Sequence, residues 1–126
     1  MKTEKTLLSL DEKDREMIKK TGTFIIPSDI NKIAGSVFFG CKDLKTITIP
    51  ESVSFITKFA FYDCRNLKSV KFCSVPQINW DAFANTNIRE VVLTEELSHN
   101  TEFRYDLRNI LGSQIRFAVE VEEEME

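Results

Sequence analysis

The sequence predicts a short α/β solenoid of about five turns, with a parallel sheet on its concave face and a helical cap at each end. Three features support this fold. A block of apolar residues recurs with a period close to 23, each copy ends in alternating apolar residues, and amphipathic segments flank the copies. The 126 residues form one small domain, and 42% hydrophobic and 29% charged residues are typical of a globular protein.

The repeat is clearest when residues 47–72 are compared with residues 24–49. An offset of 23 aligns nine apolar, proline or cysteine positions, among them the pairs Ile26/Ile49, Pro27/Pro50, Phe38/Phe61 and Cys41/Cys64. A third copy follows with two one-residue deletions, and a looser copy comes after it. The alternation at the end of each copy indicates a strand with one face in the core. The predicted inward pairs are Phe24/Ile26, Ile47/Ile49, Val70/Phe72, Val91/Leu93 and Ile115/Phe117.

Each copy also contains an L-x-x-L-x-L kernel, which is typical of leucine-rich repeats with periods of 20–29 residues. The kernels are Leu44-x-x-Ile47-x-Ile49, Leu67-x-x-Val70-x-Phe72 and Ile88-x-x-Val91-x-Leu93. A single turn cannot bury its apolar edge, so the turns are expected to stack. The sequence therefore predicts a leucine-rich-repeat solenoid.

The turns resemble the BspA-type leucine-rich repeat family, whose repeats look like C-x-x-L-x-x-I-x-I-P-x-x-V-x-x-I-x-x-x-A-F. Residues 41–53 read CKDLKTITIPESV, and Ile56, Ala60 and Phe61 continue the pattern. The resemblance covers residues 23 to about 97. It implies an adhesion or interaction module, often one exposed at the cell surface.

Three parts of the chain are predicted: residues 1–22 as an N-terminal helical cap, residues 23–119 as the solenoid with a capping helix at about 101–111, and residues 120–126 as an acidic tail. The first helix is expected over residues 9–20, because Ser9 and Glu12 have the spacing of a capping box. Its apolar face would carry Leu10, Met17 and Ile18. A solenoid needs such caps to cover its ends.

The acidic tail contains the glutamates Glu120, Glu122, Glu123, Glu124 and Glu126. A run of like charges is usually solvated. The alternative interpretation is an acidic lure for a basic protein surface.

No catalytic, metal or cofactor site is predicted. Cys41, Cys64 and Cys73 are an odd number of cysteines without metal-ligand spacing, and His99 is the one histidine. Cys41 and Cys64 occupy the same repeat position, where they are expected to be buried thiols, with a disulfide as the alternative. No nucleophile motif accompanies His99, which is expected to lie on a surface loop.

The same composition bears on partners and location. A net charge of −3 and a pI of about 5.3 do not indicate nucleic-acid binding. No apolar run is long enough for a membrane helix. The sequence shows no export signal, so a cytoplasmic location is expected, whereas the family resemblance leaves a secreted or cell-surface location open.

The aromatic residues are predicted to belong to the core. Phe38, Phe61 and Phe83 recur at one repeat position, and Tyr105 is the candidate fourth member of that column. Trp80 is expected to pack against the convex layer, with a half-exposed contact site as the alternative.

The open, concave face of the sheet is the predicted binding surface. Its candidate residues are Ile25, Thr46, Thr48, Ser69, Lys71, Glu90, Val92, Gln114 and Arg116, with a central row of Ile25, Thr48, Lys71, Val92 and Arg116. The predicted function is non-catalytic binding of a protein partner through this face. The alternative is a small intracellular inhibitor, for example of phage or mobile-element anti-defence type, acting through the tail or the sheet. A homodimer through an exposed terminal strand is a further option.

Overall fold

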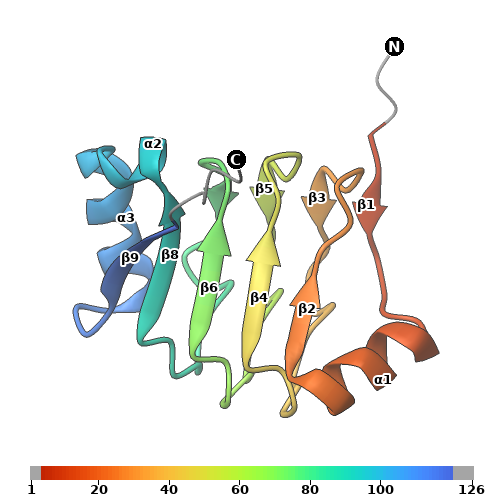
Figure 1. The fold of residues 1–126 in the computed structure, drawn as a ribbon. Coiled ribbons are helices and arrows are strands. Elements are labelled where there is room, and N and C mark those ends of the chain that lie inside the picture. Colours follow the sequence, from red (N-terminus) through yellow and green to blue (C-terminus); the bar gives the residue numbers. More distant parts are fainter. Residues whose placement is uncertain (1–3, 121–126) are drawn as a thin grey trace, which may run out of the picture.

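Successive turns of the chain stack side by side and form two parallel sheets (Figure 1). The computed structural model describes residues 4–120. The larger sheet has the strand order β2-β4-β6-β8-β9, and the smaller has the order β1-β3-β5-β7. The elements are β1 Thr6–Leu7, α1 Glu12–Thr21, β2 Thr23–Ile25, β3 Lys32–Ile33, β4 Thr46–Ile49, β5 Phe55–Ile56, β6 Ser69–Phe72, β7 Gln77–Ile78, β8 Glu90–Thr94, α2 Glu95–Ser98, α3 Thr101–Leu111 and β9 Arg116–Glu120.

The five-stranded sheet confirms the solenoid that the repeat predicts. In β4 and β6, every second residue is fully buried, and Ile47 pairs with Val70 and Ile49 with Phe72. Because each strand bonds to the equivalent strand of the next turn, equivalent apolar residues lie over one another in the core. The alternate residues face outward and form the open face of this sheet.

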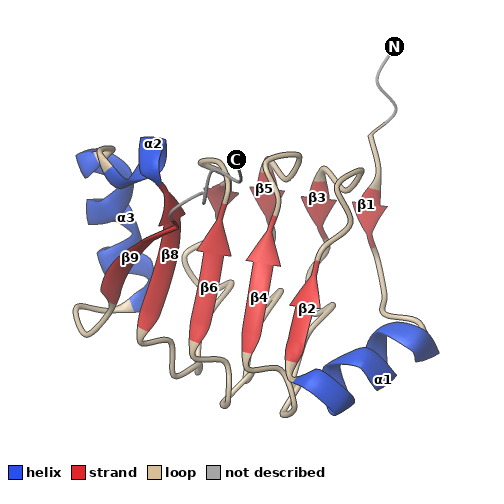
Figure 2. Cartoon of the chain, in the orientation of Figure 1, coloured by secondary structure: helices blue, strands red, loops and turns tan. Residues whose placement is uncertain are grey.

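The four-stranded sheet was not predicted from the sequence. Its strands have only two residues each, which is too short to show an alternating pattern. β1 pairs with β3, so the segment 1–22, predicted as a helical cap, also supplies a strand. The two sheets lie on two different sides of the stacked turns, and the helices lie at the two ends of the array (Figure 2).

A stacked column of phenylalanines fills the core between the sheets. The ring centroids of Phe38 and Phe61 are 4.7 Å apart, and those of Phe61 and Phe83 are also 4.7 Å apart, with nearly parallel planes. The prediction that Tyr105 extends this column is wrong, because its side chain is 67% exposed on α3. Phe103 lies at that end instead, with its ring edge-on to Phe72 at 5.5 Å.

The first helix begins later than predicted. Asp11 is its N-cap and accepts a hydrogen bond from the backbone N–H of Asp14, whose carboxylate accepts from the Asp11 backbone N–H, so the predicted Ser9–Glu12 capping box is wrong. Ile18 is buried, but Met17 is 53% exposed, contrary to its predicted place on the apolar face. Gly22, with φ of 74°, ends the helix and donates its N–H to the carbonyl of Ile18.

The C-terminal turn differs most from the repeat. α3 spans Thr101–Leu111, the range predicted for the second capping helix, whereas α2 was not predicted. β9 pairs Val91 with Phe117 and Leu93 with Val119, so the predicted inward pair Ile115/Phe117 is wrong by two residues. The inserted helices lengthen this turn, which shifts the alignment of the last strand. Ile115 is still buried, in the turn that precedes β9.

Removal of one ring from the phenylalanine column is expected to destabilise the folded protein strongly. Phe61→Ala should lower the free energy of unfolding by about 3–5 kcal/mol, because the ring is fully buried between two others. Tyr105→Ala, at an exposed aromatic, should change it by less than about 0.5 kcal/mol. Urea unfolding followed by circular dichroism measures both, and equal losses would contradict the column as the centre of the core.

Candidate protein-binding face

The open face of the five-stranded sheet carries two rows of side chains, one residue from each strand. The strand pairing defines the first row as Thr23, Thr46, Ser69, Glu90 and Arg116, and the second as Ile25, Thr48, Lys71, Val92 and Ala118. The predicted central row, which corresponds to the second row, ended at Arg116. This is wrong because the inserted helices lengthen the last turn, so that Ala118 pairs with Val92. Arg116 instead lies opposite Glu90 at the end of the first row.

Gln114 does not belong to the open face, although it was predicted there. It precedes β9, and its side-chain amide donates hydrogen bonds to the carbonyls of Ile88 at 3.0 Å and Leu111 at 2.9 Å. These bonds hold the turn between α3 and β9. The other eight predicted residues lie on the five-stranded sheet.

The two halves of the open face differ in chemistry. Near β2 and β4 it carries threonine hydroxyls and Ile25, whose side chain is 67% exposed. Towards β8 and β9 it carries charged groups, and the hydroxyl of Ser69 lies 3.3 Å from a carboxylate oxygen of Glu90. The face therefore offers hydrogen-bonding groups and one exposed apolar side chain, without a large apolar patch.

An ion pair crosses the charged half. The ammonium of Lys71 in β6 lies 2.5 Å from a carboxylate oxygen of Glu120 in β9, so the lysine side chain extends past the intervening strand β8. The side chain of Lys71 is 24% exposed, and that of Glu120 is 44% exposed. This pairing neutralises the one lysine of the second row, so the face is less basic than its sequence suggests.

Glu120, predicted as the first residue of the acidic tail, is the last residue of β9. Its ion pair with Lys71 was not predicted, because the two residues lie far apart in the sequence. Glu122, Glu123, Glu124 and Glu126 lie outside the described residues, and their predicted tail stays a prediction.

The cysteines are free thiols with a lowered tendency to ionise. Cys64 is fully buried, its Sγ lies 2.8 Å from the carbonyl oxygen of Phe38, and burial raises the pKa of the thiol to about 12. Burial also raises the pKa of Cys41 and of Cys73. None of the three resembles an activated nucleophile, whose pKa would be lowered. His99 is exposed at the end of α2, as expected for a surface loop.

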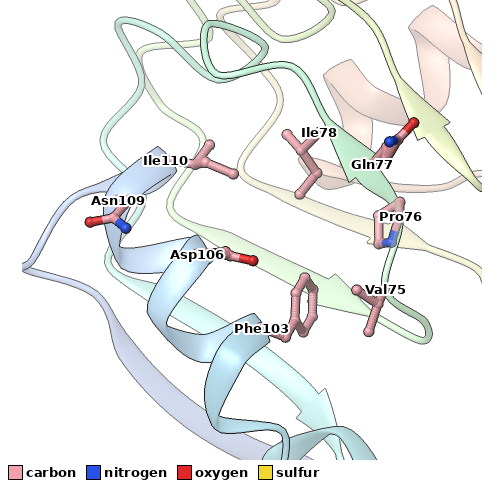
Figure 3. A pocket seen from close by; sticks show the side chains of 8 residues that line it. All are labelled: Val75, Pro76, Gln77, Ile78, Phe103, Asp106, Asn109 and Ile110. Atoms are coloured by element: carbon pink, nitrogen blue, oxygen red, sulfur yellow. The ribbon is translucent and has the colours of Figure 1, made fainter.

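A cleft of about 420 Å³ lies between α3 and the segment Val75–Ile78 (Figure 3). Ile110 of α3 points toward Ile78, Phe103 lies beside Val75, and Asp106 and Asn109 complete the α3 side of the lining. Asp106 is the single ionisable group in the lining. One carboxylate with no base, nucleophile or cation beside it does not form a catalytic set.

Within residues 4–120, no three His, Cys, Asp or Glu side chains gather in a way that could hold a metal ion. Nor does that part of the chain contain a helix with the length and apolar character needed to cross a membrane. The cytoplasmic location stays a prediction.

Stacked parallel strands, one repeat to each turn, define a solenoid repeat protein, a class that presents extended sheets to other proteins. The sequence matches the family described as BspA type leucine rich repeat region, with 6 copies over residues 3–107, and the chain belongs to this family. The family typically has a non-catalytic interaction fold and indicates a protein-interaction module.

A solved structure of a leucine-rich repeat protein from Bacteroides ovatus is similar, with a TM-score of 0.38 and 16% sequence identity. The match covers 79% of this chain and 42% of that protein, so the chain spans less than half of its length. No curated protein matches the sequence.

The Lys71–Glu120 pair should make a small, salt-dependent contribution to stability. In a double-mutant cycle of Lys71→Met and Glu120→Gln, we expect a coupling of about 0.5–1 kcal/mol, because both groups are partly exposed. The coupling should shrink in concentrated salt, because both side chains are partly exposed to the screening ions. Denaturant unfolding of the four proteins measures it, and a coupling of zero at low salt would show that the pair does not hold β9.

Cys64 should react slowly with alkylating agents in the folded protein. At pH 8.5 we expect iodoacetamide to modify Cys41 and Cys73 first, since the Cys64 thiol is buried and has a pKa of about 12. Mass spectrometry of the labelled peptides checks this order of reaction, and equal rates at all three sites would contradict it.

The raised pKa of Cys64 also predicts a pH dependence of stability. The folded state keeps the thiol proton to a higher pH than the unfolded state does, so the free energy of unfolding should fall as pH rises above about 9.

Proposed function

We propose that the open face of the five-stranded sheet binds a protein partner and that this binding is the function of the chain. The observation that carries the proposal is the pair of outward rows on five hydrogen-bonded strands. At about 4.8 Å between strands, such a sheet is roughly 20 Å wide. That width is sufficient for one modest protein interface.

The side chains of the face suggest how a partner would be recognised. Ile25 can supply an apolar anchor, and Thr46, Thr48 and Ser69 can exchange hydrogen bonds with a partner backbone or side chain. Since Lys71 is already paired with Glu120, an acidic partner would have to compete with an intramolecular carboxylate. We therefore propose a partner recognised by shape and hydrogen bonding on this face.

The decisive variant places a large side chain at the centre of the face. Thr48→Arg lies in the second row between Ile25 and Lys71, and its outward side chain does not enter the core. Charge reversal at Lys71 is less informative, because it would place two carboxylates beside one another at Glu120. Ser113→Arg, in the exposed turn before β9, adds the same side chain away from the face.

A tagged pull-down with the unaltered chain identifies the partner, and calorimetry with the purified partner then compares the variants. We expect Thr48→Arg to weaken the affinity at least tenfold and Ser113→Arg to leave it unchanged. Circular dichroism must show that both variants are folded. Equal affinities for Thr48→Arg and the unaltered chain would place the site elsewhere on the molecule.

A further inference from the structure

A second surface of the molecule carries exposed and half-buried aromatic residues on the turns that follow β3, β5 and β7. It consists of Phe39, Lys58, Phe59, Tyr62 and Trp80, which we call the aromatic stripe. Trp80 was expected to be buried, but its side chain is 78% exposed, and Phe39 is 56% exposed. Exposed aromatics that gather on one surface are typical of contact sites, in which tryptophan and tyrosine are enriched.

Four of the five residues of the stripe contact one another. The rings of Phe39 and Tyr62 stack at 5.3 Å between centroids, and Phe59 meets Tyr62 edge-on at 5.1 Å. The ammonium of Lys58 lies 5.0 Å from the centre of the Phe59 ring. Because Ile56 pairs with Ile78, Trp80 occupies the position one turn on from Lys58. Three consecutive turns therefore contribute to one stripe.

The backbone at Phe59 gives a second, independent indication. Its φ is 60°, in the left-handed region, and Ser36, one turn earlier, has a φ of 65°. A bulky side chain is a costly choice there, and glycine or asparagine would fit with less strain. Strained residues persist where the side chain has a use, and here the side chain is part of the stripe.

The charges of the stripe indicate the kind of partner. The stack of Phe39 on Tyr62 and the ammonium of Lys58 over Phe59 each cover one face of a ring. Lys58 makes no ion pair with residues 4–120, whereas the nearby carboxylate of Asp63 is already bound by Arg65 and Asn85. The stripe therefore combines exposed aromatic rings with one ammonium group that is free to pair with a partner's carboxylate.

We propose that the aromatic stripe binds an acidic peptide segment of a partner protein that also carries apolar side chains. Carboxylates of the segment would pair with Lys58, and its apolar side chains would pack on the exposed rings of Trp80 and Phe39. This site is separate from the open face of the five-stranded sheet.

The test uses a random peptide display library, selected in parallel on the full chain and on the double variant Lys58→Glu/Trp80→Ser. We expect the full chain to enrich peptides that combine Asp or Glu with aliphatic or aromatic residues. Synthetic versions should shift the fluorescence of Trp80, which is the single tryptophan of the chain, and should bind the double variant at least tenfold more weakly. The matched control, Lys68→Glu/Tyr105→Ser, makes the same changes at exposed positions outside the stripe.

Two further variants separate the proposal from loss of folding and from the proposed function. Phe59→Gly removes the ring and suits the left-handed backbone, so it should unfold at the same or a higher denaturant concentration and still bind the peptides more weakly. Thr48→Arg should bind them normally. Any one of four results would overturn the proposal. The library could yield basic peptides or no enriched peptides, the stripe and control variants could bind equally, or the chain could self-associate through the stripe.

Discussion

The structure depends on one constraint: each strand must bond to the equivalent strand of the next turn. Once Ile47 pairs with Val70, the residues of neighbouring turns are aligned along the whole repeat. Inward positions must then carry side chains that pack on copies of themselves, which the column of Phe38, Phe61 and Phe83 does with nearly parallel rings. Outward positions are aligned by the same bonds, so the surface of the molecule also consists of rows.

This constraint explains how much could be predicted from the sequence. The inward residues recur because the core requires it, and their period was sufficient to predict the larger sheet and its core. Features that break the repeat could not be found in this way. The two-residue strands have no alternation, and the alignment of β9 depends on how α2 and α3 lengthen the last turn.

The candidate binding residues were predicted less completely than the core, for a related reason. Outward positions are not restricted by packing, so their sequence shows where they lie but not what they contact. The pairing of Lys71 with Glu120 joins strands that are far apart in sequence, and no local pattern indicates it. Similarly, Trp80 was assigned to the interior on residue type and Tyr105 on its repeat position, whereas both are exposed.

The two ends of the array differ in what lies beside their edge strands, which bears on the predicted homodimer through a terminal strand. At the C-terminal end the guanidinium groups of Arg104 and Arg108 lie 4.9 and 4.8 Å from the ring centre of Phe117, so α3 covers the apolar residue of the edge strand. Charged groups over an edge discourage strand pairing. At the other end, Ile25 of the edge strand β2 is largely exposed beside Met17 of α1. The two edge strands therefore differ in what lies beside them, and a homodimer through a terminal strand stays a prediction.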